Sequence, residues 1–105
     1  METKADIARS GLIAPIVGHV GDGNFHAAVL VDMSDPEEVR GAEAFLERVA
    51  ERALVMEGTC TGEHGIGQGK KHFMGAEFGE PGVALMRALK RAIDPAGIMN
   101  PGKIV

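Results

Sequence analysis

The sequence predicts one small α+β domain, in which a small antiparallel sheet packs with two main helices. The length of 105 residues and the hydrophobic content of 45% suit a single domain. Two apolar runs flank a glycine-rich loop in the first third of the chain, as they do in a hairpin. Two later stretches carry apolar residues at intervals of three or four, which is typical of amphipathic helices. So few strands cannot cover both faces of their own sheet, and a further layer is expected.

The hairpin is expected within residues 12–31. Residues 12–17 form its first strand, and Pro15 indicates an edge or an irregular start. Residues 26–31 form the return strand, which is rich in β-branched residues near its end.

The turn of this hairpin is expected at Asp22 and Gly23. An Asp-Gly pair between apolar runs favours a type I′ turn, because both central residues of that turn need φ > 0. With this turn His19 lies directly opposite His26, and directly opposed Cβ atoms are about 5 Å apart. Two imidazoles at that spacing are close enough to share one divalent ion.

The first main helix is expected to begin at Pro36 and to end at Gly58. Asp35 can cap its start, and proline suits the first helical position. Glu38 completes a pattern that resembles a capping box. The apolar stripe of this helix consists of Val39, Ala42, Phe45, Val49, Ala53 and Met56.

The second half of the chain is expected to begin with a short β-like run, Thr59–Thr61. Residues 69–78 are expected to form a short helix. Pro81 opens a last helix that stops before Asp94 and Pro95. Its buried stripe consists of Val83, Met86, Leu89 and Ile93.

Composition argues against several classes of function. The 15 acidic and 11 basic residues give a net charge of −4, whereas nucleic-acid binding needs a concentrated positive surface. No apolar run approaches the roughly 18 residues of a membrane span. The single cysteine, Cys60, excludes an internal disulfide and fits a reducing compartment. With no signal-peptide core at the N-terminus, a cytoplasmic location is expected.

Three of the four histidines lie in two glycine-rich loops. His19, His26 and Glu63 offer two imidazoles and a carboxylate, a donor set that suits Zn²⁺ with an open position, and also Mn²⁺ or Fe²⁺. The alternative interpretation makes the two histidines a cross-strand polar pair and Glu63 a solvated loop residue. Spacing alone leaves both interpretations open.

The remaining reactive side chains have plain interpretations beside functional ones. His64 can act as a general base near pH 7, or it can be an exposed loop histidine. His72 is expected at the surface. Cys60 is expected to be a small buried residue and not a nucleophile, because nothing near it indicates a lowered pKa.

Three motifs then occur in a fixed order: GHVGDGNFH at residues 18–26, GTCTGEHGIG at residues 58–67 and DPAGIMNPGKI at residues 94–104. Together they resemble the C-terminal end of FAD-linked oxidases of the vanillyl-alcohol-oxidase superfamily. The most similar branch holds D-lactate dehydrogenases, glycolate oxidase subunits and D-2-hydroxyglutarate dehydrogenases. The resemblance covers roughly residues 10–105.

This resemblance implies the oxidation of a D-2-hydroxy acid by FAD. It implies that His19, His26 and Glu63 hold a zinc or manganese ion, which binds the carboxylate and hydroxyl oxygens of the substrate. His64 would accept the hydroxyl proton while hydride leaves Cα for the flavin. Asn100 would contact the region of the flavin.

Members of this family carry a large FAD-binding domain ahead of these motifs. We therefore expect residues 1–105 to be a C-terminal fragment, part of the substrate (cap) domain, that is inactive without an FAD-binding partner chain. One alternative is a standalone metal-binding module that forms homo-oligomers through exposed apolar surface. Another is a small metallohydrolase in which Glu63 or His64 activates a zinc-bound water.

Overall fold

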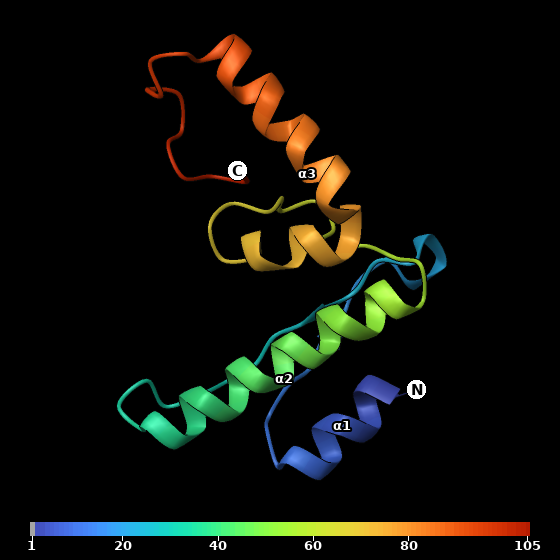
Figure 1. Ribbon diagram of the computed structural model, residues 1–105. Helices are drawn as coiled ribbons and strands as arrows, with labels where there is room; N and C mark the ends of the chain where they lie inside the picture. The colour runs from blue at the N-terminus through green and yellow to red at the C-terminus, as the bar shows by residue number, and fades with distance from the viewer. Residues whose placement is uncertain (1) are drawn as a thin grey trace. The chain divides into compact units, whose positions relative to one another are not determined.

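Three α-helices and one two-stranded antiparallel sheet make up the structure, a computed structural model that describes residues 2–105 (Figure 1). This confirms the predicted α+β class. The chain divides into a first unit that ends at Ala53 and a second unit that begins at Leu54. The elements in order are α1 (Glu2–Ser10), β1 (Ile16–Val17), the 3₁₀-helix η1 (Val20–Asp22), β2 (His26–Ala27), α2 (Pro36–Val55), the 3₁₀-helix η2 (Lys71–Phe73) and α3 (Met74–Ile93).

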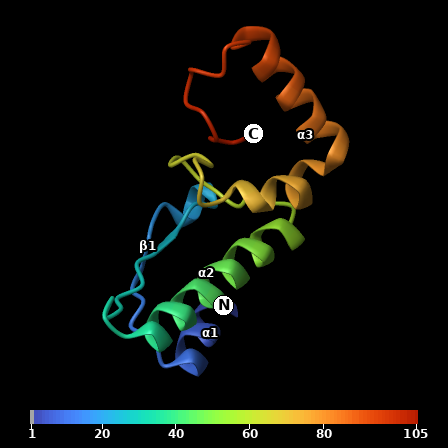
Figure 2. The same cartoon turned by 60° about the vertical axis from the view of Figure 1, so that its left-hand side comes forward.

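The hairpin of the first unit forms between the two predicted apolar runs, but its ladder is short (Figure 2). The backbone N–H of Ala28 donates to the carbonyl of Pro15 at 3.0 Å, just beyond the paired strands. The opposed residues are Ile16 and Ala27, Val17 and His26, and, in an isolated bridge, Ile13 and Leu30.

The predicted two-residue turn is wrong, and so is the pairing of His19 with His26. His26 lies opposite Val17, two residues away from the predicted partner. The reason is the 3₁₀-helix η1 inside the loop, where the carbonyl of His19 accepts the backbone N–H groups of Asp22 at 2.9 Å and Asn24 at 3.2 Å. An offset of two residues keeps a side chain on the same face of a strand, so His26 keeps its predicted face.

This wider loop depends on Gly18. Its φ is 152°, and a Cβ at this position would lie 2.5 Å from Cα of Phe25 and 2.7 Å from the carbonyl oxygen of Asn24. A side chain therefore cannot be added without moving the backbone on the other side of the loop.

The start of α2 confirms Asp35 as the N-cap. One oxygen of its carboxylate, Oδ1, accepts the backbone N–H groups of Glu37 at 2.8 Å and Glu38 at 3.4 Å. Glu38 does not complete a capping box, because its Oε2 accepts the N–H of Asp32 at 2.8 Å. The N–H of Asp35 donates instead to the carbonyl of Asp32 at 3.0 Å.

α2 ends at Val55, before the predicted end at Gly58. Glu57 has a left-handed φ of 60°, which is incompatible with a continuing helix. Met56 is therefore outside the helix and 77% exposed, which corrects its place in the predicted stripe. The other stripe residues face inward: Ala42 and Phe45 are buried, and Val39, Val49 and Ala53 are half-buried.

Residues 2–10 form α1, for which the sequence predicted no element. The helix is joined to α2 by Asp6, which is 4% exposed. The carboxylate of Asp6 accepts hydrogen bonds from Nε and Nη2 of Arg48, both at 3.0 Å, and from Nη1 of Arg52 at 2.7 Å. These bonds, first from Arg48 and then from Arg52, lower the pKa of Asp6 to about 2.

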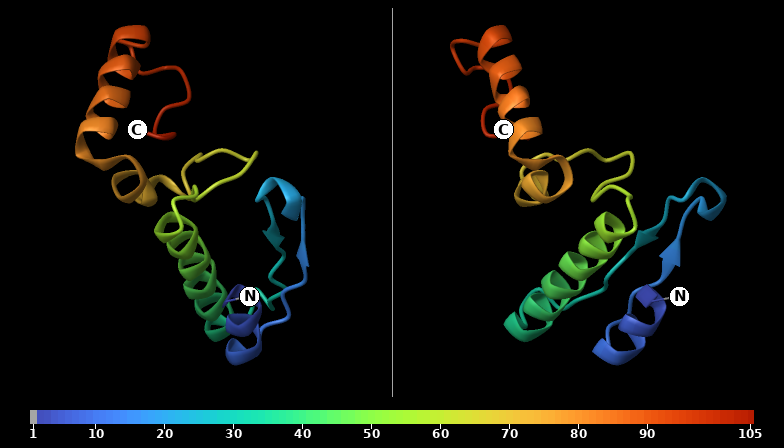
Figure 3. Two further views of the ribbon diagram at one scale, coloured as in Figure 1. Left: turned by 90° about the vertical axis from the view of Figure 1, so that its right-hand side faces the viewer. Right: turned by 45° about the vertical axis from the view of Figure 1, so that its right-hand side comes forward.

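In the second unit, α3 contains the last predicted helix and the second half of the one predicted for residues 69–78, joined across a bend at Gly79 (Figure 3); residues 71–73 form η2 instead. Gly79 has φ 66° and ψ 168°, outside the helical region. Pro81 lies in the first turn after the bend, where its missing N–H costs no helical hydrogen bond. Before α3, the β-like run predicted for Thr59–Thr61 is an irregular loop.

The predicted buried stripe of α3 is largely wrong. Val83 is buried at 5% exposure and Met86 is half-buried. Leu89 and Ile93 are 54% and 70% exposed. The spacing correctly indicated a helix with one apolar face, but spacing alone does not say whether anything covers that face.

The chain after α3 is held by Asp94, which is 7% exposed. Its carboxylate accepts hydrogen bonds from Lys90 Nζ at 2.5 Å and from the backbone N–H groups of Ile98 at 3.0 Å and Met99 at 2.9 Å. The bond from Lys90 makes the largest contribution to lowering the pKa of Asp94. The tail then returns toward the start of α3 (Figure 1), and the N–H of Ile104 donates to the carbonyl of Gly67 at 2.9 Å.

Replacing Asp6 by Asn removes the negative charge between Arg48 and Arg52, and we expect the Tm to fall by roughly 5 °C or more. The folded pKa of Asp6, about 2, lies below its ordinary value of 3.8, so its contribution is complete above about pH 4 and is lost as the pH falls toward 2. The urea midpoints of the unmodified chain and of Asp6→Asn should therefore converge as the pH falls below 4. The exposed Glu43→Gln serves as the control, and an equal gap at pH 7 and pH 3 would contradict this account.

Replacing Gly18 by Ala is expected to destabilise the first unit by about 1–3 kcal/mol, because the new Cβ meets backbone atoms at a strained φ. Gly21→Ala is the matched control in the same loop, since a Cβ there meets nothing within 4 Å. Urea denaturation compares the two variants, and equal midpoints would argue against the close approach at Gly18.

Candidate functional site

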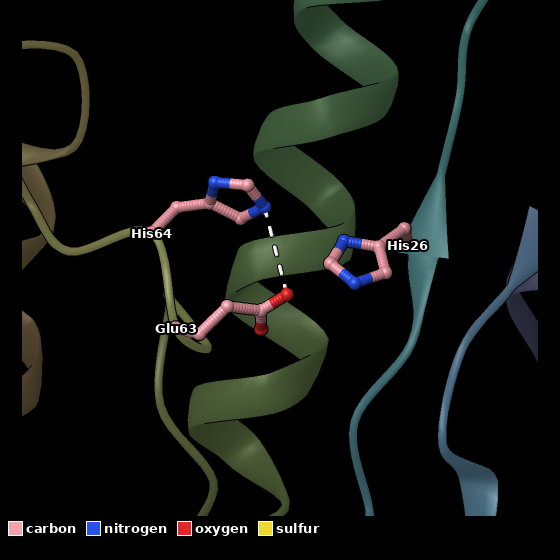
Figure 4. A group of neighbouring side chains, drawn as sticks. All are labelled: His26, Glu63 and His64. Carbon is pink, nitrogen blue, oxygen red and sulfur yellow. Dashed lines mark ion pairs between the residues drawn. The ribbon is translucent and has the colours of Figure 1, made fainter.

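Glu63 and His64 form an adjacent pair of reactive side chains in the second unit. His64 Nε2 lies 3.6 Å from Glu63 Oε1, as the dashed line in Figure 4 marks. The side chains are exposed, at 74% for His64 and 56% for Glu63. An imidazole and a carboxylate held side by side can exchange a proton or contribute ligands to one cation.

The loop that carries this pair is shaped by its own glycines. Gly65 and Gly67 have left-handed φ values of 75° and 55°. The hydroxyl of Thr61 donates to the carbonyl of Gly65 at 3.0 Å, which closes the loop across Glu63 and His64. The local sequence therefore forms a tight turn with both side chains on it.

The other two predicted ligands belong to the first unit. His26 is half-buried on β2, where the ladder with Val17 fixes its backbone. His19 is exposed and directly precedes η1. Neither unit by itself contains all three predicted ligands, so the set of His19, His26 and Glu63 stays a prediction.

Three further sequence predictions concern single residues. Cys60 is 6% exposed, which confirms the predicted burial, and burial, followed by a hydrogen bond with Glu77, raises its thiol pKa to about 11. His72 is exposed, as predicted, and its ring centroid lies 4.0 Å from that of Phe73. Asn100 lies in the exposed tail with a φ of 46°, and its proposed contact to a flavin stays a prediction.

Sequence reasoning missed Glu77, whose Oε2 accepts the N–H of Cys60 at 3.1 Å. It also missed Lys70, whose Nζ donates to the carbonyl of Cys60 at 2.8 Å. A signal for Glu77 was present in the sequence. Phe73 and Met74 are buried, and a carboxylate three or four residues later shares their helical face.

None of the helices within residues 2–105 is both long and apolar enough to cross a membrane.

Comparison with known proteins supplies the family. Residues 1–104 match the family described as FAD linked oxidases, C-terminal domain. A probable mitochondrial D-lactate dehydrogenase of Danio rerio is 50% identical over the whole chain, which covers 21% of that protein. The mitochondrial D-lactate dehydrogenase [cytochrome] 1 of Saccharomyces cerevisiae is 53% identical over 98% of the chain, or 17% of its own length. The glycolate oxidase subunit GlcD of Bacillus subtilis is 39% identical over 83% of the chain, or 18% of its own length.

The chain thus spans about a fifth of the length of these relatives. The resemblance predicted from the three motifs is confirmed, and the chain belongs to the FAD-linked oxidases, matching their C-terminal domain.

Proposed function

We propose that this chain provides the metal-binding and proton-accepting part of an FAD-dependent D-2-hydroxy-acid dehydrogenase or oxidase. The named relatives act on D-lactate or glycolate, and both are 2-hydroxy acids. The observation that carries the proposal is the exposed pair of Glu63 and His64, held side by side on a glycine turn. The substrate would be a small 2-hydroxy acid.

The donor atoms of the chain fit a divalent metal in chemical type. His19, His26 and Glu63 would hold zinc or manganese, because two imidazoles and one carboxylate leave coordination positions open for a substrate. The strand-paired backbone of His26 and the exposed carboxylate of Glu63 support this assignment. A bound ion would supply Lewis acidity toward the hydroxyl and carboxylate oxygens of the substrate.

His64 is the proposed acceptor of the substrate's hydroxyl proton. Its exposed imidazole can reach a bound molecule, and imidazole is the side chain suited to proton transfer near neutral pH. The carboxylate of Glu63, adjacent in sequence and 3.6 Å away, favours the protonated imidazole that accepting the proton would produce.

FAD would supply the hydride acceptor in the complete enzyme. We assign to this chain only a contact from Asn100, on the tail that Asp94 holds. An FAD-binding domain or partner chain would supply the rest of the flavin site, so the chain alone would be inactive. We propose a cytoplasmic location for this chain, whereas two of the relatives are named as mitochondrial.

A second candidate function is a standalone metal-binding module that associates with itself. The observation in its favour is the exposed apolar face of α3, where Leu85, Leu89 and Ile93 recur every four residues at 54–70% exposure. Such a face on a monomer is a typical site of protein association.

The metal assignment predicts that the purified chain binds zinc or manganese at one ion per chain. His19→Ala and His26→Ala should each weaken that affinity by about tenfold or more, because each removes a direct ligand. Isothermal titration calorimetry and elemental analysis measure the change, with His72→Ala as the control imidazole. Unchanged affinity in both ligand variants would remove the metal hypothesis.

The catalytic assignment is tested by a chimera in which this chain replaces the matching fifth of the Danio rerio relative. We expect the chimera to oxidise D-lactate or glycolate, and His64→Ala to lower its kcat by about 100-fold or more. His72→Ala should leave kcat unchanged. A folded, flavin-loaded chimera without activity toward any 2-hydroxy acid would favour the second candidate.

A further inference from the structure

The backbone of Cys60 is held from both sides by charged side chains. Its N–H donates to Oε2 of Glu77 at 3.1 Å, and its carbonyl accepts Nζ of Lys70 at 2.8 Å. Hydrogen bonds of this kind, with one ionised partner, are roughly twice as strong as neutral ones. A single residue of the loop therefore has both of its backbone polar groups fixed by charges.

Glu77 gathers more than this one bond. The side chains of Thr59 and Cys60 also act on its carboxylate in the direction that lowers its pKa. Burial favours the neutral acid, yet these hydrogen bonds keep the pKa of Glu77 below its ordinary value. The carboxylate is thus ionised at neutral pH, and its Oε2 lies against the start of the loop.

Lys70 closes the other end of the same loop. It follows the glycine turn, and its backbone N–H donates to the carbonyl of Ile66 at 3.3 Å. Its side chain returns to Cys60, so residues 61–69 form a closed segment with both ends tied together. Glu63 and His64 lie inside this segment.

From these contacts we propose that Glu77 and Lys70 are positioning residues that fix the loop carrying Glu63 and His64. Glu77 acts through the backbone of Cys60, three residues before Glu63, and Lys70 acts on the same residue from the far end. We call the two hydrogen bonds from Glu77 and Lys70 to the backbone of Cys60 the clamp. The importance of this clamp for metal binding rests on the proposed function. The fixing of the loop itself rests only on the hydrogen bonds.

The experiment compares Glu77→Ala, Glu77→Gln and Lys70→Met in the full chain. Gln keeps an oxygen that can accept the N–H of Cys60, whereas Ala leaves that N–H without its partner. Met keeps much of the length of Lys70 but cannot donate to the Cys60 carbonyl. Glu80→Ala is the matched control, since Glu80 is an exposed carboxylate on the same helix.

Two measurements are made on variants whose circular dichroism shows a folded chain. Amide hydrogen exchange reports the order of residues 61–67, and the visible spectrum of added Co²⁺ with its titration reports the ligand geometry. We expect Glu77→Ala and Lys70→Met to speed exchange in the loop and to weaken Co²⁺ binding by about tenfold or more. Glu77→Gln should restore most of both, and Glu80→Ala should change neither.

The two proposals fail in different ways. If the unmodified chain gives no Co²⁺ spectrum, the metal assignment fails and loop exchange alone decides the role of Glu77 and Lys70. If Glu77→Ala and Lys70→Met exchange their loop amides as slowly as the unmodified chain, the clamp is overturned whatever the metal does. If Glu77→Ala does not fold, Lys70→Met and Glu77→Gln decide between these outcomes.

Discussion

Carboxylates that accept several hydrogen bonds at once are the interaction on which both units of this chain depend. Among the described residues each unit buries only four apolar side chains: Ala14, Ala42, Phe45 and Ala50 in the first, and Cys60, Phe73, Met74 and Val83 in the second. The burial of so few apolar side chains cannot by itself hold the loops and the tail in place, so these segments depend on hydrogen bonds as well. Asp6 joins α1 to α2, Glu77 holds the loop before Glu63, and Asp94 holds the tail after α3.

These carboxylates also determine which parts of the chain stay exposed. The backbone of the loop that carries Glu63 and His64 is tied at Cys60, while the two side chains themselves are exposed. The tail that carries Asn100 is likewise held by the backbone bonds to Asp94. The side chains of Glu63, His64 and Asn100 are therefore open to solvent, while hydrogen bonds hold the backbone near them, which suits a binding site.

The sequence predicted the features that depend on neighbouring residues. Asp35 caps α2, Pro81 opens the second segment of α3, and Asp94 ends it. Each of these effects depends on residues a few positions away in the sequence, so the sequence pattern shows it. The glycine turn around Glu63 and His64 was found for the same reason. That Glu63 shares an ion with His19 and His26 stays a prediction, which spacing left open and the family resemblance implied.

The features that were missed depend on distant residues. α1 is joined to α2 by Asp6 and Arg48, which are 42 positions apart, and most of its own residues are polar or charged. The hairpin register depends on how closely Gly18 approaches Phe25, which an Asp-Gly pattern does not reveal. The exposed side of α3 shows the same limit, since periodicity identifies an apolar face without identifying what covers it.

The bend of α3 at Gly79 has a consequence for how this domain can change. The segment before the bend carries Glu77, which holds the loop of Glu63 and His64, and the segment after it ends at Asp94, which holds the backbone just before Asn100. The bend thus sets the directions of the two helical segments, while the bond from the N–H of Ile104 to the carbonyl of Gly67 ties the end of the tail back to the loop of Glu63 and His64. Any side chain at Gly79 would have to adopt this left-handed φ of 66°, so a substitution there would strain the bend while leaving every reactive group chemically intact.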